Sequence, residues 1–221
     1  MYEQDGDESN GPEPIEWAIL DENKDGTLLI NRYILDYVPY HDTSDNKVTW
    51  ETCSLREWLN NDFYNTAFDD EMKLKINTVT LANEDNQRDG APGGNDTSDM
   101  IFCLSLSEII KYYTFDYLSP DAWSHGFSQE LITPPTMYAK DRGTGKTIIT
   151  DELIYYINRC YDCSYSADCV GKMGASWWLR THGEEVGSAC LVVGSGETGE
   201  NVYYRLSDNR PGVRPALYIN K

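Results

Sequence analysis

The chain has 221 residues, of which 40% are hydrophobic and 12% aromatic, enough to bury the core of one large domain or of two small ones. Asp and Glu number 37 against 18 Lys and Arg, and the resulting net charge of −19 argues against a nucleic-acid partner, because phosphate backbones are bound by clustered basic residues. No apolar run approaches the roughly 20 residues that cross a bilayer, so we expect no membrane insertion.

Residues 1–14 are acidic, contain glycine and proline, and have no apolar core segment, so they do not form a signal peptide. We expect a flexible acidic leader here, left where an export signal or an upstream domain was removed. From Ile15 to Lys221 we expect a single domain, with an insertion near residues 150–174.

Two apolar runs, Ile15–Asp21 and Thr27–Tyr33, are separated by a short polar stretch that ends in Asp-Gly. An Asp-Gly pair between two such runs predicts a β-hairpin. The polar stretch also imitates a calcium-binding loop that begins at Asp21. Its twelfth position is Arg32, where such loops have a bidentate glutamate, so we expect a hairpin without calcium.

Helical patterns follow in the middle of the chain. Ser54 and Glu57 have the spacing of a capping box, and apolar residues recur behind them at helical spacing. This pattern predicts a helix from Leu55 to about Asn61, with its tryptophan in the core. A second helix is expected over Phe68–Ile76, because acidic residues at its start favour the positive end of the helix dipole.

The stretch Asn83–Ser98 is long, polar and rich in glycine, which predicts a loop. Met100–Leu104 is apolar and predicts a buried strand. Ser105 and Glu108 again have the spacing of a capping box, and they predict a helix over Leu106–Tyr113.

The segment Gly143–Thr147 has the composition of a phosphate-binding loop but not its spacing. The first glycine of that motif would fall at Lys140, and the residues after the segment favour a strand where the motif requires a helix. We therefore expect a turn and no bound nucleotide, followed by a helix over Asp151–Arg159.

The six cysteines divide into dispersed and clustered residues. Cys53 and Cys103 lie in apolar surroundings and are expected to be buried thiols. The cluster comprises Cys160, Cys163 and Cys169. With His182 or Cys190 it would complete a zinc site, although the second ligand pair typical of structural zinc is absent. A local disulfide and unpaired thiols are the alternatives, and we expect no required metal or cofactor.

The C-terminal part predicts strands joined by polar turns. Residues 201–206 alternate, with Val202, Tyr204 and Leu206 on one side, as in a strand with one buried face. Four strands of one small antiparallel sheet are expected: Ala175–Thr181, Ser188–Val193, Asn201–Ser207 and Val213–Ile219. Polar turns on a packed scaffold are typical of a binding surface.

Several motifs resemble an uncharacterised bacterial domain family found in gut Firmicutes and their phages. They are Trp-Trp-Leu-Arg at 177–180, Gly-Val-Arg-Pro-Ala-Leu at 212–217, and the segments Thr49–Thr52, Leu55–Phe63 and Phe102–Glu108. The match covers roughly Ile15 to Ile219. The family in turn resembles the C-type-lectin-like fold shared by formylglycine-generating enzymes and the variable proteins of diversity-generating retroelements. The resemblance implies an α+β domain with short helices packed on a small twisted antiparallel sheet.

The variable proteins keep a framework fixed and vary solvent-facing residues near the C-terminus, which implies a ligand-binding face in this chain. The framework would comprise Trp178, Leu179, Gly212, Arg214, Pro215 and Ala216, with the arginine as an ion-pair or carbonyl-binding residue. The face would comprise His182, Glu184, Glu185, Ser195, Glu197, Asn201, Tyr203, Arg205, Ser207, Asp208, Asn209 and Arg210.

Tyr, Arg and Asn make large or adaptable contacts, so the expected ligand is a protein or a glycan. The expected location is a cell surface or a phage particle. An invariant structural or adhesion module of a larger bacterial surface protein is the alternative function.

We do not expect an enzyme. The three histidines lie in no nucleophile motif such as GxSxG, and the zinc-protease motif HExxH is absent. A formylglycine-generating-type oxidase is the less favoured alternative, because those enzymes use a late pair of cysteines and no cysteine follows Cys190. The Glu-Pro-Asn and Gln-Pro-Asp triplets of calcium-dependent sugar-binding lectins are absent as well.

Overall fold

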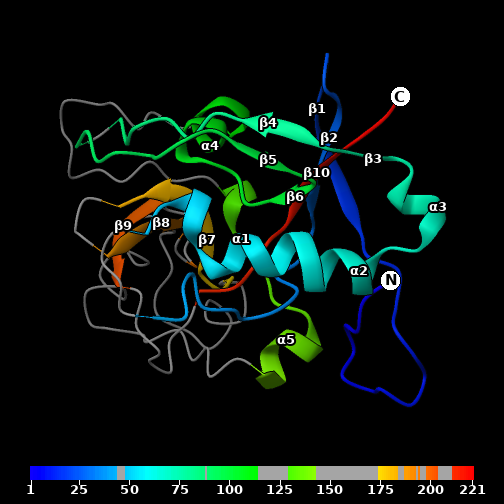
Figure 1. Ribbon diagram of the computed structural model, residues 1–221. Coiled ribbons are helices and arrows are strands. Elements are labelled where there is room, and N and C mark those ends of the chain that lie inside the picture. The colour runs from blue at the N-terminus through cyan, green and yellow to red at the C-terminus, as the bar shows by residue number, and fades with distance from the viewer. Residues whose placement is uncertain are drawn as a thin grey trace.

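The computed structural model describes residues 1–43, 48–87, 89–113, 129–142, 174–183, 187–192, 194, 198–203 and 211–221, with the backbone alone at residues 129 and 198–203. Within these residues, small antiparallel sheets and short helices share one hydrophobic core (Figure 1). The expected mixture of short helices and small antiparallel sheets is therefore confirmed. The predicted elements at Gly143–Thr147 and Asp151–Arg159, and the cysteine cluster, lie outside the described residues.

The largest sheet has the strand order β1-β2-β10-β3, and β6 also pairs with β10. Its strands are β1 Trp17–Asn23, β2 Gly26–Asn31, β3 Ile76–Asn77, β6 Ile101–Phe102 and β10 Ala216–Ile219. All of its pairings are antiparallel. The first two strands form the predicted hairpin around the Asp-Gly turn.

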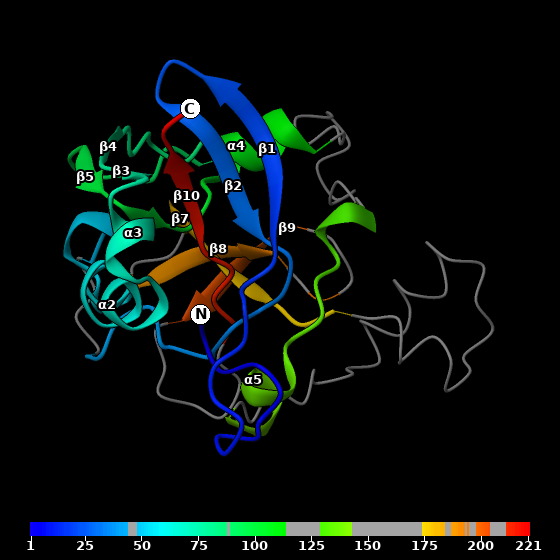
Figure 2. The same cartoon turned by 90° about the vertical axis from the view of Figure 1, so that its right-hand side faces the viewer.

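The last strand, β10, corrects the prediction of four C-terminal strands in one sheet. It pairs with β2 in the large sheet, with Leu217 opposite Leu29, instead of with its sequence neighbours. Ala216, Leu217 and Tyr218 are all buried. A strand covered on both faces fits the middle of a sheet, and Figure 2 shows β10 (red) beside β2.

Two smaller sheets complete the β-structure. β4 Val79–Leu81 pairs with β5 Thr97–Asp99, and β7 Trp177–His182, β8 Ser188–Val192 and β9 Thr198–Tyr203 follow in that order in a three-stranded sheet. Every residue of β8 is buried, as is every residue of β7 except the last. This sheet is therefore covered on both faces along its first two strands.

The first helical region is longer than predicted, and its start is different. It runs through η1 Trp50–Thr52, α1 Ser54–Trp58, the π-helical segment η2 Leu59–Phe63 and α2 Tyr64–Ala67. Figure 1 shows α1 to α2 as one helical stretch (cyan). The predicted capping residue, Ser54, is wrong: the Sγ atom of Cys53 accepts the hydrogen bond from the Arg56 amide, at 3.4 Å. The Ser54 hydroxyl lies instead 3.0 Å from His41 Nδ1.

The second capping box is confirmed. Ser105 Oγ accepts a hydrogen bond from the amide of Glu108 at 3.1 Å, and the carboxylate of Glu108 accepts one from the amide of Ser105 at 2.8 Å. The helix that follows is α4, Leu106–Tyr112. The remaining described helices are α3 Asp70–Lys73, η3 Gln129–Leu131 and α5 Met137–Arg142. The first of these is shorter than the predicted Phe68–Ile76 helix, because β3 begins at Ile76.

The N-terminal segment, for which a flexible acidic leader was expected over residues 1–14, contacts the domain through Tyr2 and Gln4. Tyr2 pairs with Glu13 across a loop, and its ring is buried against the core. The Tyr2 hydroxyl donates a hydrogen bond to Asp36 at 2.8 Å, and the carbonyl of Gln4 accepts one from Tyr138 in α5. None of the helices that the structure describes is long and apolar enough to cross a membrane.

Candidate functional site

The register of the small sheet divides the predicted binding face between its two ends. Ser188, at the start of β8, pairs with Tyr203 at the end of β9, and the next residue pairs with His182 at the end of β7. Val192, at the other end of β8, pairs with Thr198. The connection from β7 to β8 and the exit from β9 therefore start at one end of the sheet, which we call the His182 end. The connection from β8 to β9 starts at the opposite end.

Part of the predicted face belongs to the described strands. His182 is half-buried, with Nδ1 2.6 Å from the carbonyl oxygen of Gly183. Asn201 and Tyr203 lie in β9, where only the backbone is described. The other predicted site residues lie outside the described residues: Glu184, Glu185, Ser195, Glu197, Arg205, Ser207, Asp208, Asn209 and Arg210.

All the residues predicted as framework are buried. Arg214 donates a hydrogen bond from Nε to the carbonyl of Asn31 at 2.8 Å, and its guanidinium lies 5.0 Å from the ring centre of Trp177. Burial lowers the pKa of this guanidinium. The predicted carbonyl-binding role of Arg214 is thus confirmed. A Cβ atom on Gly212 would overlap the side chain of Ile34, so the close approach of these segments requires glycine.

A second buried arginine joins the small sheet to α4. Arg180 in β7 forms an ion pair with Glu108, with Nη2 3.1 Å from Oε1, and also donates to the carbonyl of Cys103. The side chains of Arg180 and Glu108 are 4% and 19% exposed. Thr181, the next residue, accepts a hydrogen bond on Oγ1 from the amide of Leu106 at 2.8 Å. These contacts fix the His182 end of β7 against the start of α4.

A polar pocket, here named the Arg180 pocket, opens beside this junction. It has a volume of about 220 Å³, and a more enclosed space of about 10 Å³, the size of a single water site, shares part of its lining and is called its inner part. The residues common to both parts are Ala82, Glu84, Ser105, Ser107 and Arg180, and the inner part also contacts Asn83, Asp85 and Thr181. Its outer wall includes Asp25, Glu108 and Tyr218.

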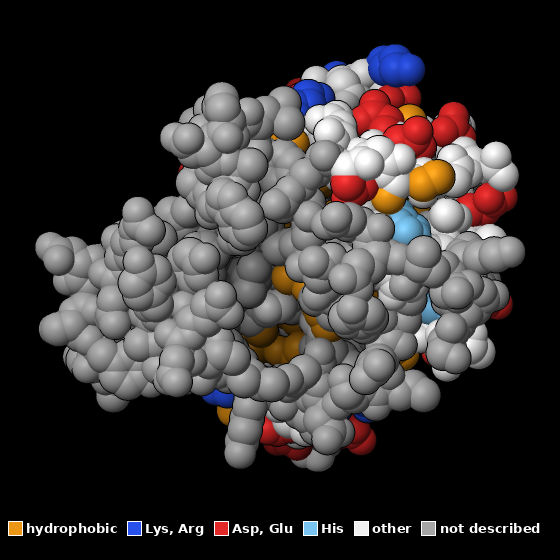
Figure 3. Space-filling model, turned by 90° about the vertical axis from the view of Figure 1, so that its left-hand side faces the viewer, with side chains coloured by type: hydrophobic (Ala, Val, Ile, Leu, Met, Phe, Trp, Pro, Cys, Tyr) orange, Lys and Arg blue, Asp and Glu red, His pale blue; other side chains and the backbone are white. Residues whose placement is uncertain are grey.

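Two buried polar atoms beside this pocket lack a hydrogen-bond partner: Asn83 Oδ1, an acceptor, and Arg180 Nε, a donor. Buried polar atoms in native proteins are nearly always paired with protein, water or a ligand. An unused donor and an unused acceptor are therefore buried next to the pocket, whose lining also includes carboxylates and hydroxyls. On the face shown in Figure 3, described acidic side chains (red) gather at the upper right.

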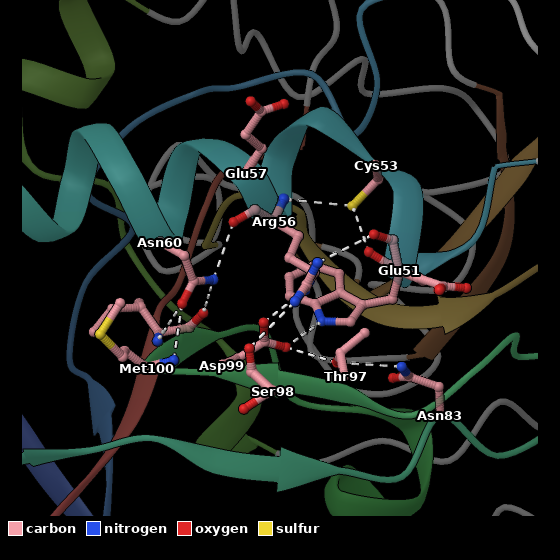
Figure 4. A network of polar contacts seen from close by, with 12 residues as sticks. Glu51, Cys53, Arg56, Glu57, Asn60, Asn83, Thr97, Ser98, Asp99 and Met100 are labelled. Carbon is pink, nitrogen blue, oxygen red and sulfur yellow. Dashed lines mark hydrogen bonds and ion pairs between the residues drawn. The ribbon is translucent and has the colours of Figure 1, made fainter.

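The motifs in the first half of the chain have internal roles. The buried carboxylate of Asp99 accepts hydrogen bonds from Trp50 Nε1 at 3.0 Å, Thr97 Oγ1 at 2.7 Å and Arg56 Nε at 2.6 Å (Figure 4). Asn60 Oδ1 accepts the amide of Met100 at 2.8 Å. This network holds α1 and η2 against β5 and β6. Sequence reasoning missed Asp99, which falls between the predicted loop Asn83–Ser98 and the predicted strand Met100–Leu104. The loop prediction is wrong at its end, where Thr97 and Ser98 belong to β5.

The same network reaches the Arg180 pocket. Asn83 Nδ2 donates to the carbonyl of Asn95 at 2.7 Å and lies 3.3 Å from Thr97 Oγ1, which in turn contacts Asp99. The amide group of Asn83 is therefore held with its unpaired oxygen in a fixed position. No local sequence signal identifies this residue.

The described cysteines are Cys53, Cys103 and Cys190, and all are buried. Burial raises the pKa of Cys53 to about 12 and that of Cys103 further. Because the thiolate is the reactive form, neither thiol is a competent nucleophile at neutral pH. The prediction of buried thiols at these two positions is confirmed.

Comparison with protein families identifies one match, to a domain of unknown function, DUF6273, over residues 24–221. The match includes the Trp-Trp-Leu-Arg motif of β7, the Gly-Val-Arg-Pro-Ala-Leu motif that leads into β10, and the network around Asp99. The chain therefore belongs to the DUF6273 family. No curated protein and no solved structure matches it.

Proposed function

We propose that this protein recognises a ligand on a C-type-lectin-like scaffold, and that the ligand binds at the His182 end of the small sheet. The observation that carries the proposal is the Arg180 pocket, with its unpaired donor and acceptor, next to the end of β7. The buried framework around Arg180 and Arg214 supports it, because a rigid scaffold lowers the entropy cost of binding. Catalysis is not proposed: the described thiols are buried, and burial raises the pKa of Cys53 and of Cys103.

A hydroxyl-rich ligand fits this pocket best. Carboxylates of Glu84 and Glu108 accept hydrogen bonds, the buried Nε of Arg180 can donate through one water in the inner space, and a sugar hydroxyl both donates and accepts. An anionic ligand would be repelled by these carboxylates and by Asp85. A volume of about 220 Å³ is below the range for a whole small-molecule ligand, so the pocket suits one sugar unit of a larger glycan.

A glycan array tests this proposal. The intact, fluorescently labelled protein is expected to bind a subset of oligosaccharides, and the best of them is then titrated against variants. Glu84→Ala at the pocket and Tyr203→Ala on the predicted face should each weaken binding by about tenfold. Glu57→Gln is a matched control, because Glu57 is exposed on α1 and lies outside the pocket.

Folding of each variant is checked by its melting temperature. Failure of the intact protein to bind any glycan would contradict the ligand class. Unchanged affinity in both Glu84→Ala and Tyr203→Ala would contradict the location of the site.

We also propose that this face is diversified, as in the variable proteins that the family resembles, and the coding DNA tests this separately. A near-copy of the last stretch beside a reverse-transcriptase gene, differing only at adenines, would support it. Closely related genes with no such copy and with identical C-terminal stretches would support an invariant surface module instead.

A further inference from the structure

A second concave site lies away from the small sheet, between the N-terminal segment, η2 and α5. It has a volume of about 340 Å³, larger than the Arg180 pocket and within the range of small-molecule sites. Figure 2 shows the N-terminal segment (dark blue) beside α5. We call this site the aromatic groove, and its rings are those of Tyr2, Trp58, Phe63 and Tyr138.

The four rings form a continuous series. The ring centres of Trp58 and Phe63 are 5.5 Å apart, those of Phe63 and Tyr2 5.3 Å, and those of Tyr2 and Tyr138 5.8 Å. The Tyr2 hydroxyl donates to the buried carboxylate of Asp36, which fixes the ring. Burial, together with this carboxylate, raises the pKa of Tyr2. The aromatic surface is therefore held in place before any ligand arrives.

The charged groups around these rings are mostly negative. Glu8 and Asp62 line the groove, both are exposed, and among the described residues neither forms an ion pair. Glu3 also lines it and accepts a hydrogen bond from the amide of Gly6. No lysine or arginine among the described residues lines the groove, and the amino group at Met1 contacts the carbonyl of Ala67.

One ring of the groove already accepts a cation on its surface. The guanidinium of Arg142 lies 5.0 Å from the ring centre of Tyr138, while its Nε is 3.5 Å from Asp36. Aromatic faces attract cations through the ring quadrupole, most strongly for tryptophan. Trp58 is half-buried and carries no such cation among the described residues.

We propose that the aromatic groove binds an organic ammonium ion. The rings accommodate the apolar groups attached to the nitrogen, and Glu8 and Asp62 balance its charge. A hard metal ion would use the carboxylate oxygens but not the apolar faces of the rings, and an anion is disfavoured by the carboxylates. This inference concerns different residues from the proposed function and does not depend on it.

A charged and a neutral probe of the same shape test the proposal by calorimetric titration of the intact protein. Choline carries a trimethylammonium group, and 3,3-dimethylbutan-1-ol has a neutral tert-butyl group in its place. We expect choline to bind at least about tenfold more tightly than the neutral alcohol, and its affinity to fall as salt is added. Equal binding of the two probes, or no binding of choline, would overturn the proposal.

Variants locate the bound ion. Asp62→Asn combined with Glu8→Gln should weaken choline binding by about fivefold or more, with little effect on folding because both residues are exposed. Trp58→Leu keeps an apolar side chain but removes the ring, and it should weaken binding by a similar factor. Glu57→Gln is the control: it removes an exposed charge one residue before Trp58 and should leave the affinity unchanged. Choline binding that survives the double charge variant and Trp58→Leu would place the ion elsewhere and contradict the groove.

Discussion

Gly26 and Gly90 both have a positive φ, but only Gly26 lies against other atoms. Comparing the two separates the cost of backbone strain from the cost of steric overlap when a Cβ atom is added. Gly26 has φ +123°, and a Cβ atom there would overlap the carbonyl oxygen of Ile219. Gly90 has φ +78° with open space around it. We expect Gly26→Ala to lower the free energy of unfolding by about 3 kcal/mol and Gly90→Ala by about 1 kcal/mol, as measured by urea denaturation. Equal losses would mean that the overlap at the hairpin is relieved by a backbone shift.

The Arg180–Glu108 pair is the residue contact on which the candidate site most depends. Glu108→Gln keeps the shape of the side chain but leaves the guanidinium of Arg180 buried without a counter-charge. The free energy of unfolding should fall by about 3 kcal/mol, because the charge of Arg180 would remain buried, out of contact with water, without an opposite charge to compensate it. Glu71→Gln, which breaks the exposed pair with Lys75, should cost under about 1 kcal/mol. A similar small loss in both variants would show that Arg180 finds another partner.

At the scale of elements, the two predicted capping boxes differ although their spacing is the same. Ser105 caps α4, whereas α1 is capped by Cys53, whose Sγ accepts a hydrogen bond from the amide of Arg56. Ser105→Ala should therefore lower the free energy of unfolding by about 1 kcal/mol, and Ser54→Ala by a few tenths. Thermal denaturation of the two variants side by side makes the comparison. A larger loss at Ser54 than at Ser105 would contradict the assigned caps.

The π-helical segment η2 has a packing consequence at the same scale. It carries the helical stretch from Trp58 on to Phe63, whose ring is buried against Tyr2 and Phe68. Asn60, within it, binds the amides of Met100 and Ile101. The helical stretch thus contacts both the β6 region and the aromatic groove.

At the scale of the whole molecule, the buried thiols should make the free energy of unfolding fall as the pH rises above neutral. The pKa of Cys53 is raised from 9.0 to about 12 by burial. Because the pKa is higher in the folded state, the protonated thiol contributes fully to the free energy of unfolding below pH 9. This contribution is lost as the pH rises toward 12. Each such thiol should lower the free energy of unfolding by about 1.4 kcal/mol per pH unit within this window.

Urea denaturation at about pH 8 and about pH 10, under reducing conditions, measures this dependence. The loss between the two pH values should be smaller in Cys53→Ala than in the wild-type protein. The same loss in both would show that other groups, such as lysines or tyrosines, cause the pH dependence.

Features that depend on residues close together in the sequence were predictable from the sequence by itself. The Asp-Gly turn fixed the first hairpin, the Ser105–Glu108 spacing fixed the start of α4, and apolar surroundings identified the thiols of Cys53 and Cys103 as buried. The turn and the cap each involve residues a few positions apart, so their spacing in the sequence specifies them. The burial of the two thiols follows from the apolar residues next to them.

Only the tertiary structure decided the partners of β10, the cap of α1 and the composition of both pockets. The contacts involved join distant positions: Leu217 with Leu29, Ser54 with His41, and Arg180 with Glu108. No periodicity or motif relates such residues, because their proximity results from packing the sheets and helices on one core. For this reason the sequence determined the class of elements and the buried framework, while the fold determined which polar groups meet in the Arg180 pocket and which rings meet in the aromatic groove.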